Sequence, residues 1–203
     1  MRLPPDTVLL VIDMQQAIDD PVWGPRINPG AEAAVAALLA AWREAGWPVV
    51  HVRHDSVEPR SPYRAGQALH AFKPEAMPRP GEDVVAKSSG SAFVGTGLEA
   101  LLEARGATTL VVCGVLAHNS VDTTVRHAGC LGFRVALVDD ACWSVDRRDR
   151  SGRVWPAEAV HALAMAHLDG EYARVTDAAG ILAAVRLTVA HGAWKRHRLS
   201  TRA

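Results

Sequence analysis

The chain has 203 residues, the usual length of one α/β domain. Lys and Arg together number 22, as do Asp and Glu, so the formal net charge of zero predicts neither nucleic acid nor a membrane surface as a partner. Hydrophobic residues make up 49% of the chain, which excludes a disordered protein. The three cysteines form no CxxC pair, and we see no secretion signal or membrane-spanning run, so we expect a reduced, cytoplasmic protein.

Short β-branched runs alternate with longer Ala- and Leu-rich stretches along the chain. We expect strands at 7–12, 48–53, 83–87, 108–113, 133–138 and 172–175. We expect helices at 31–45, 97–104, 118–131, 156–168 and 178–190. This alternation predicts a three-layer, Rossmann-like α/β fold in which a six-stranded parallel sheet carries helices on both faces. We assign residues 1–190 to this domain and 191–203 to a basic C-terminal tail without periodicity.

Two charged residues stand at the carboxyl ends of predicted strands. Asp13 follows the run 7–12 directly, and Lys87 ends the run 83–87. Because the active sites of open α/β sheets lie at this edge, the two side chains can form an ion pair that activates a nucleophile or holds a proton. Taken alone, each has a plainer interpretation, with Asp13 capping a following helical turn and Lys87 lying at the surface.

The segment 114–124, Gly-Val-Leu-Ala-His-Asn-Ser-Val-Asp-Thr-Thr, follows the fourth predicted strand. Gly114 allows a tight turn, and Ser120 falls in the first turn of the next helix. The free N–H groups of a helix N-terminus suit a nucleophile whose product is an oxyanion. On this segment alone, a simple helix-start serine is the more economical interpretation.

Three motifs together resemble the signature regions of the isochorismatase-like hydrolases: Val-Ile-Asp13-Met-Gln, Lys87, and Gly114-Val-x-x-x-x-Ser120-Val-x-x-Thr124. The segments Ser91-Ala-Phe and Asp140-Ala-Cys-Trp also fit, and the likeness extends to about Val175. The superfamily includes cysteine hydrolases such as nicotinamidases and N-carbamoylsarcosine amidases, in which Asp, Lys and Cys form the catalytic triad. The resemblance therefore implies Asp13 as the base, Lys87 as its partner, and Ser120 at the position of the nucleophilic Cys.

The resemblance also implies an oxyanion hole. The family has a non-proline cis peptide bond ahead of the nucleophile helix, which would here join Val115 to Leu116, with the N–H groups of Leu116 and Ser120 as donors. Nicotinamidases hold a divalent ion with an Asp-x-His pair after the second strand, and that pair is absent from His51-Val-Arg-His54-Asp55. We therefore expect no metal and no other cofactor.

Ser120 leaves three functions open, because a serine hydroxyl needs much stronger activation than a thiol. The first is a hydrolase of an amide or other C–N bond, with Ser120 either a replacement of the family Cys or a natural variant. The second is a Cys-independent hydrolase or lyase of the vinyl-ether type that uses Asp13 as an acid, and the pair Ala117-His118 resembles such enzymes. The third is a non-catalytic protein that binds a small molecule.

Aromatic and polar side chains near the same sheet edge predict a pocket for a small, flat or cyclic substrate. The predicted substrate-binding residues are Gln16, Trp23, His54, Tyr63, Phe93, His118, Asn119, Trp143 and Trp155. The proline-rich stretch 54–82 is long for a connection and carries Tyr63, Leu69, Phe72 and Met77. We expect a second subunit to cover these apolar groups, which predicts a homodimer or a higher homo-oligomer.

Overall fold

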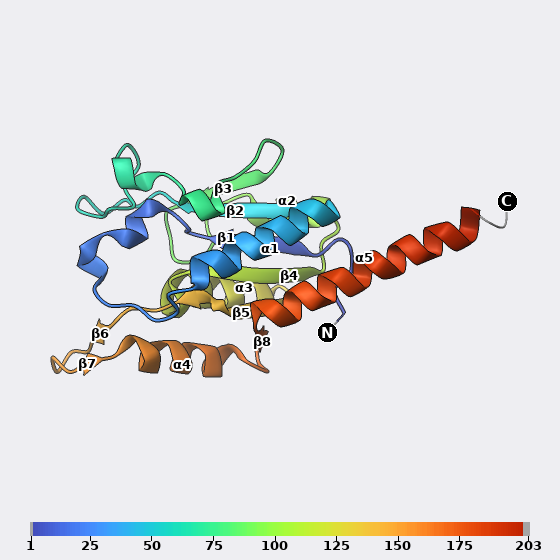
Figure 1. The fold of residues 1–203 in the computed structure, drawn as a ribbon. Helices are drawn as coiled ribbons and strands as arrows, with labels where there is room; N and C mark the ends of the chain where they lie inside the picture. The colour runs from blue at the N-terminus through green and yellow to red at the C-terminus, as the bar shows by residue number, and fades with distance from the viewer. Residues whose placement is uncertain (1, 201–203) are drawn as a thin grey trace.

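The computed structural model describes the backbone of residues 2–200 and the side chains of residues 2–192. Six parallel strands form one sheet in the order β3-β2-β1-β4-β5-β8. These strands are β1 (Val8–Ile12), β2 (Val49–His54), β3 (Asp83–Lys87), β4 (Thr109–Val115), β5 (Arg134–Trp143) and β8 (Arg174–Thr176). The α-helices are α1 (Ala31–Ala45), α2 (Leu98–Ala104), α3 (Asp122–Cys130), α4 (Ala157–Leu168) and α5 (Ala178–Ser200). Figure 1 shows α1 and α5 side by side over the sheet, and the predicted α/β fold is confirmed.

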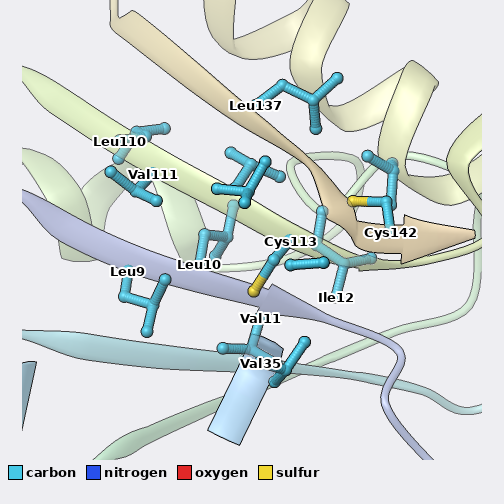
Figure 2. Close-up of a cluster of buried hydrophobic side chains, with 14 of the residues drawn as sticks. Leu9, Leu10, Val11, Ile12, Val35, Leu110, Val111, Cys113, Leu137 and Cys142 are labelled. Atoms are coloured by element: carbon cyan, nitrogen blue, oxygen red, sulfur yellow. The ribbon is translucent and has the colours of Figure 1, made fainter. Parts of the chain in front are cut away.

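The central strands β1 and β4 are buried along their whole length, as their continuous apolar sequences predict for a parallel sheet covered on both faces. Figure 2 shows their side chains, with Val35 of α1 packed against Val11. A hydrogen bond of 2.9 Å from Trp42 Nε1 to the carbonyl oxygen of Thr7 ties the same helix to the start of β1. The core therefore fixes the strand ends that carry the candidate site.

Gly114 has a different role from the tight turn that the sequence predicts. The strand β4 continues through it to Val115, and its φ is 120°. A Cβ atom at this position would lie 2.1 Å from the carbonyl oxygen of Ile12, so only glycine lets the backbones of β1 and β4 approach this closely.

Several element ends differ from the sequence prediction. The predicted helix 118–131 begins instead as one turn of π-helix, η5 (Ala117–Val121), followed by α3. The last helix runs to Ser200 rather than ending near residue 190, so the predicted tail is helical as far as the backbone is described. The side chains of residues 193–200 and all of residues 201–203, which make up most of the predicted basic tail, lie outside the described part.

The remaining elements are short. An antiparallel hairpin, β6 (Arg147–Arg148) with β7 (Val154–Trp155), was not predicted because two-residue strands carry no periodicity. The 3₁₀ helices are η1 (Gln16–Asp19), η2 (Pro21–Trp23), η3 (Ala68–His70) and η4 (Pro74–Ala76). No helix in the described residues is both long and apolar enough to cross a membrane.

The proline-rich stretch 54–82 packs back on its own domain. Tyr63 is buried, Leu69 packs against the core, and only Met77 among its predicted apolar groups is exposed, at 48%. The backbone N–H of Lys73 donates to the carbonyl oxygen of Met14 at 2.9 Å. The apolar side chains that we expected a second subunit to cover are therefore mostly covered within one chain. The oligomeric state stays a prediction.

Candidate active site

The structure brings Asp13, Lys87 and Ser120 together at the carboxyl edge of the sheet. The Nζ atom of Lys87 lies 2.8 Å from Oδ2 of Asp13 and donates a hydrogen bond of 3.1 Å to Oγ of Ser120. All three residues are buried, with relative exposures of 3%, 2% and 7% in that order. Since β2 lies between β1 and β3, the long Lys87 side chain spans the width of one strand to reach Asp13.

The buried Lys87 ammonium has more acceptors than the predicted pair alone supplies. It also donates to the carbonyl oxygen of Ser89 at 3.0 Å and lies 3.3 Å from Nδ1 of His54. A buried charge is tolerated only when it is paired and hydrogen-bonded, and Lys87 meets both conditions.

Asp13 is held in an unusual conformation at the end of β1. Its φ is 53°, and its N–H donates to the carbonyl oxygen of Val52 at 2.9 Å. Its Oδ1 atom is buried and has no hydrogen-bond partner among the described residues. Burial raises the pKa of the Asp13 carboxyl, and the Lys87 ammonium and Ser120 hydroxyl oppose part of that rise. The carboxyl therefore accepts and holds a proton more readily than an exposed aspartate does.

The backbone before Ser120 has the feature that the family resemblance implies. The peptide bond between Val115 and Leu116 is cis. The π turn that follows is closed by a hydrogen bond of 3.2 Å from the N–H of Val121 to the carbonyl oxygen of Leu116. Leu116 and Ser120 both line one cavity.

A cavity of about 220 Å³, which we call the chamber, is lined by Asp13 and Ser120, the two side chains that Lys87 contacts. Four predicted substrate-binding residues line it, namely Trp23, His54, Tyr63 and Asn119. The other lining residues beside Asp13 and Ser120 are Ser61, Ser88, Ser89, Gly90, Val115 and Leu116. The segment 88–90 was missed because it has no pattern of its own, although its place directly after Lys87 is a usable signal.

A wider hollow of about 890 Å³, which we call the vestibule, shares Trp23 and Ser61 with the chamber. Its walls carry charges of both signs, from Asp20, Glu58, Arg60, Asp146 and Arg147. The chamber and the larger vestibule therefore adjoin each other at Trp23 and Ser61.

Three predicted substrate-binding residues lie away from the chamber. Phe93 is buried against the rings of His127 and Phe133, at centroid distances of 5.0 Å and 6.2 Å. Trp143 is fully buried, with the guanidinium of Arg26 4.4 Å from its ring centroid. The Gln16 side chain is directed to the carbonyl oxygen of Phe72, at 3.5 Å. The first two are core residues, because proximity to a strand end does not decide which face a side chain takes.

His118 and Trp155 line a different hollow, of about 620 Å³, beside α3 and α4. Residues two apart on a helical turn point to nearly opposite sides, which separates His118 from Ser120. Burial lowers the pKa of His118 to about 4, so its imidazole is neutral at pH 7. The structure thus assigns neither side chain to the chamber.

No cysteine of the chain lines the chamber. Cys113 and Cys142 are buried in the core, where burial raises the pKa of the Cys113 thiol to about 12 and holds the pKa of Cys142 well above its usual range. Cys130 is exposed on α3. Among the residues described, no group of three or more His, Cys, Asp or Glu side chains could hold a metal ion.

The isochorismatase domain matches residues 7–180, which is most of the chain and includes the whole chamber. The chain belongs to the isochorismatase family. A solved structure of an isochorismatase-family protein from Chromobacterium violaceum is similar over 91% of this chain and 96% of its own, with 59% identity and a TM-score of 0.88.

Two curated relatives of this isochorismatase-family chain have named activities. A streptothricin hydrolase from Streptomyces noursei is 41% identical over 138 residues, 66% of this chain and 48% of its own. A maleamate amidohydrolase from Pseudomonas putida is 33% identical over 150 residues, 64% of this chain and 68% of its own. The chain is accordingly a hydrolase of the isochorismatase family.

Proposed function

We propose that the protein hydrolyses an amide or other C–N bond of a small molecule, with Asp13, Lys87 and Ser120 as its catalytic residues. The observation that carries the proposal is the Lys87 ammonium, which is shared between Asp13 at 2.8 Å and Ser120 at 3.1 Å on the wall of the chamber. The name of the amidohydrolase relative supports the same class of bond.

In the proposed reaction, Oγ of Ser120 attacks the carbonyl carbon of the amide while Asp13 accepts the hydroxyl proton. The C–N bond then breaks as Asp13 returns that proton to the leaving nitrogen. A water molecule attacks the acyl ester on Ser120, with its proton passing through Asp13 back to Oγ. The balance is one amide and one water consumed, one acid and one amine released.

The geometry supports this division of roles. Because Oγ of Ser120 accepts a hydrogen bond from Lys87, its own hydrogen is free to point toward the carboxyl of Asp13. The raised pKa of Asp13 brings the carboxyl nearer to the range in which a general base works best. We assign the N–H groups of Leu116 and Ser120 to the developing oxyanion, because both residues line the chamber.

The size of the chamber limits the substrate. A volume of about 220 Å³ is below the roughly 300–1,000 Å³ of sites for drug-sized ligands, so the reacting end is small. Because the vestibule shares Trp23 and Ser61 with the chamber, we expect any larger part of the substrate to lie there.

One observation favours a second function. The Oδ1 atom of Asp13 is buried without a partner and the pKa of its carboxyl is raised, which also suits an acid that protonates a vinyl ether before water adds. In that reaction Ser120 forms no covalent bond. A non-catalytic binding protein would need neither side chain for chemistry.

The discriminating experiment assays the protein against small amides, ureides and carbamoyl compounds, and against a vinyl ether. The variants are Ser120→Ala, Ser120→Cys and Asp13→Asn, with Ser151→Ala on the exposed β6–β7 connection as the matched control. We expect amide turnover that Ser120→Ala abolishes, Ser120→Cys keeps or raises, and Ser151→Ala leaves unchanged. Vinyl-ether turnover that survives Ser120→Ala and is lost in Asp13→Asn would replace this proposal with the second function.

A further inference from the structure

The His54 side chain lies beside the proposed catalytic residues and is held in a fixed place. It ends β2, directly opposite Lys87 in the β2–β3 register, and it lines the chamber. The fully buried Gln15 side chain clamps its backbone, with the His54 N–H donating to Oε1 at 2.7 Å and Nε2 donating to the His54 carbonyl oxygen at 3.2 Å. The edge of Tyr63 packs against the imidazole at a centroid distance of 5.6 Å.

The contact with Lys87 decides which ring nitrogen of His54 carries the proton. An ammonium has only hydrogens to offer, so Nδ1, at 3.3 Å from Nζ, has to accept. A hydrogen on Nδ1 would instead point at a positive charge. The neutral ring therefore carries its proton on Nε2.

The surroundings also favour the neutral ring. Burial lowers the pKa of His54, and the Lys87 ammonium lowers it further. The carboxylates of Asp13 and Asp55 and the backbone of Lys87 act in the opposite direction without reversing the shift.

The second nitrogen of His54, Nε2, has no side-chain hydrogen-bond partner among the described residues, and the ring lines the chamber. We propose that His54 presents an Nε2–H donor to an acceptor oxygen of the bound substrate. This inference rests on the proposed function, and it makes His54 a substrate-orienting residue of the same site.

The proposal narrows the substrate class. The oxygen of the scissile carbonyl is already assigned to the N–H groups of Leu116 and Ser120. The His54 donor is therefore expected to bind a second oxygen of the substrate. This favours amides that carry another carbonyl, carboxylate or hydroxyl oxygen near the bond that breaks.

The first test measures the tautomer in the full chain without substrate. Long-range ¹H–¹⁵N NMR of the labelled protein at pH 7 distinguishes a proton on Nε2 from one on Nδ1 or on both, and His54→Phe assigns the signals. We expect the neutral ring with its proton on Nε2. A proton on Nδ1, or an imidazolium at pH 7, would overturn the proposal.

The second test separates contact with substrate from contact with Lys87. In His54→Gln the amide nitrogen takes the approximate place of Nε2, whereas in His54→Asn the amide oxygen takes that of Nδ1. With the amide that turns over fastest in the panel, we expect His54→Asn to raise KM about tenfold with little change in kcat, the loss of one good hydrogen bond, and His54→Gln to stay near wild type.

The outcomes of the second test are decisive in either direction. Equal losses in the two variants, or a larger loss in His54→Gln, would show that His54 acts through Lys87 or through packing. If no amide turns over, the proposed function fails, and the NMR result still decides whether His54 offers a donor to the chamber.

Discussion

Lys87→Met should be strongly destabilising, because it leaves the Asp13 carboxylate buried without its cation. Methionine has nearly the length of lysine, so the change removes charge and donors with little loss of volume. Asp13 and Lys87 are 3% and 2% exposed, which leaves neither in reach of bulk water. Removing one member of such a buried pair typically costs about 3–5 kcal/mol of the free energy of unfolding.

The loss of unfolding free energy in Lys87→Met should increase with pH. Without Lys87, the pKa of Asp13 in the folded state rises further above its unfolded value of about 3.9. The folded variant then binds a proton at Asp13 more tightly than the unfolded chain does. The stabilisation from this proton is fully present below the pKa of Asp13 in the unfolded chain, and it is lost as the pH rises through the pKa of Asp13 in the folded variant. The deficit of Lys87→Met should therefore be largest near pH 8 and shrink as the pH falls toward 5.

Urea unfolding at the two pH values measures this, with Lys73→Met as the matched control. Lys73 is also buried and has two partners. The Asp19 side chain is 52% exposed and stays hydrated when the lysine is removed, and Glu32 keeps its ion pair with Arg26 at 2.7 Å. We expect the control to cost ~1 kcal/mol with little pH dependence. The double variant Asp13→Asn/Lys87→Met should recover much of the lost stability. A loss below about 1 kcal/mol in Lys87→Met, or an equal loss at both pH values, would refute this account of the pair.

The remaining predictions concern activity, packing and assembly. Asp13→Asn should lower kcat by roughly 10²–10⁴-fold while the folded state persists by circular dichroism, and a kcat near wild type would remove Asp13 from the mechanism. Gly114→Ala should prevent folding, since its Cβ would lie 2.1 Å from an oxygen of Ile12, whereas Gly30→Ala meets open space and should unfold at the wild-type urea concentration. In Ser120→Cys, iodoacetamide should modify the new thiol faster than the two buried native ones, as mass spectrometry would show. Light scattering at micromolar concentration should give at least twice the mass of one chain, and a single-chain mass unchanged on concentration would contradict the predicted oligomer.

The sequence was sufficient to predict which residues meet at the sheet edge, and the reason is topological. Because β1 and β3 run parallel in one sheet, their carboxyl ends lie at the same end of that sheet, and chain direction alone places Asp13 and Lys87 there. The pocket walls were predicted less well. Phe93 and Trp143 are aromatic residues close to the sheet edge, but both are buried in the core. Neighbouring residues along a strand point to opposite sides, and the residue type alone does not tell which side a side chain takes.

The sharing of Lys87 connects the catalytic proposal with the role inferred for His54. Its ammonium has three hydrogens, yet four acceptors lie within 3.3 Å, on Asp13, Ser120, Ser89 and His54. One contact is therefore always the weakest, and the distances make it the one to His54. When Asp13 takes a proton during the proposed reaction, it loses its charge and attracts the ammonium less. We expect the hydrogen bond from Lys87 to His54 to strengthen at that step, which would hold the proposed Nε2–H donor in place while the substrate reacts.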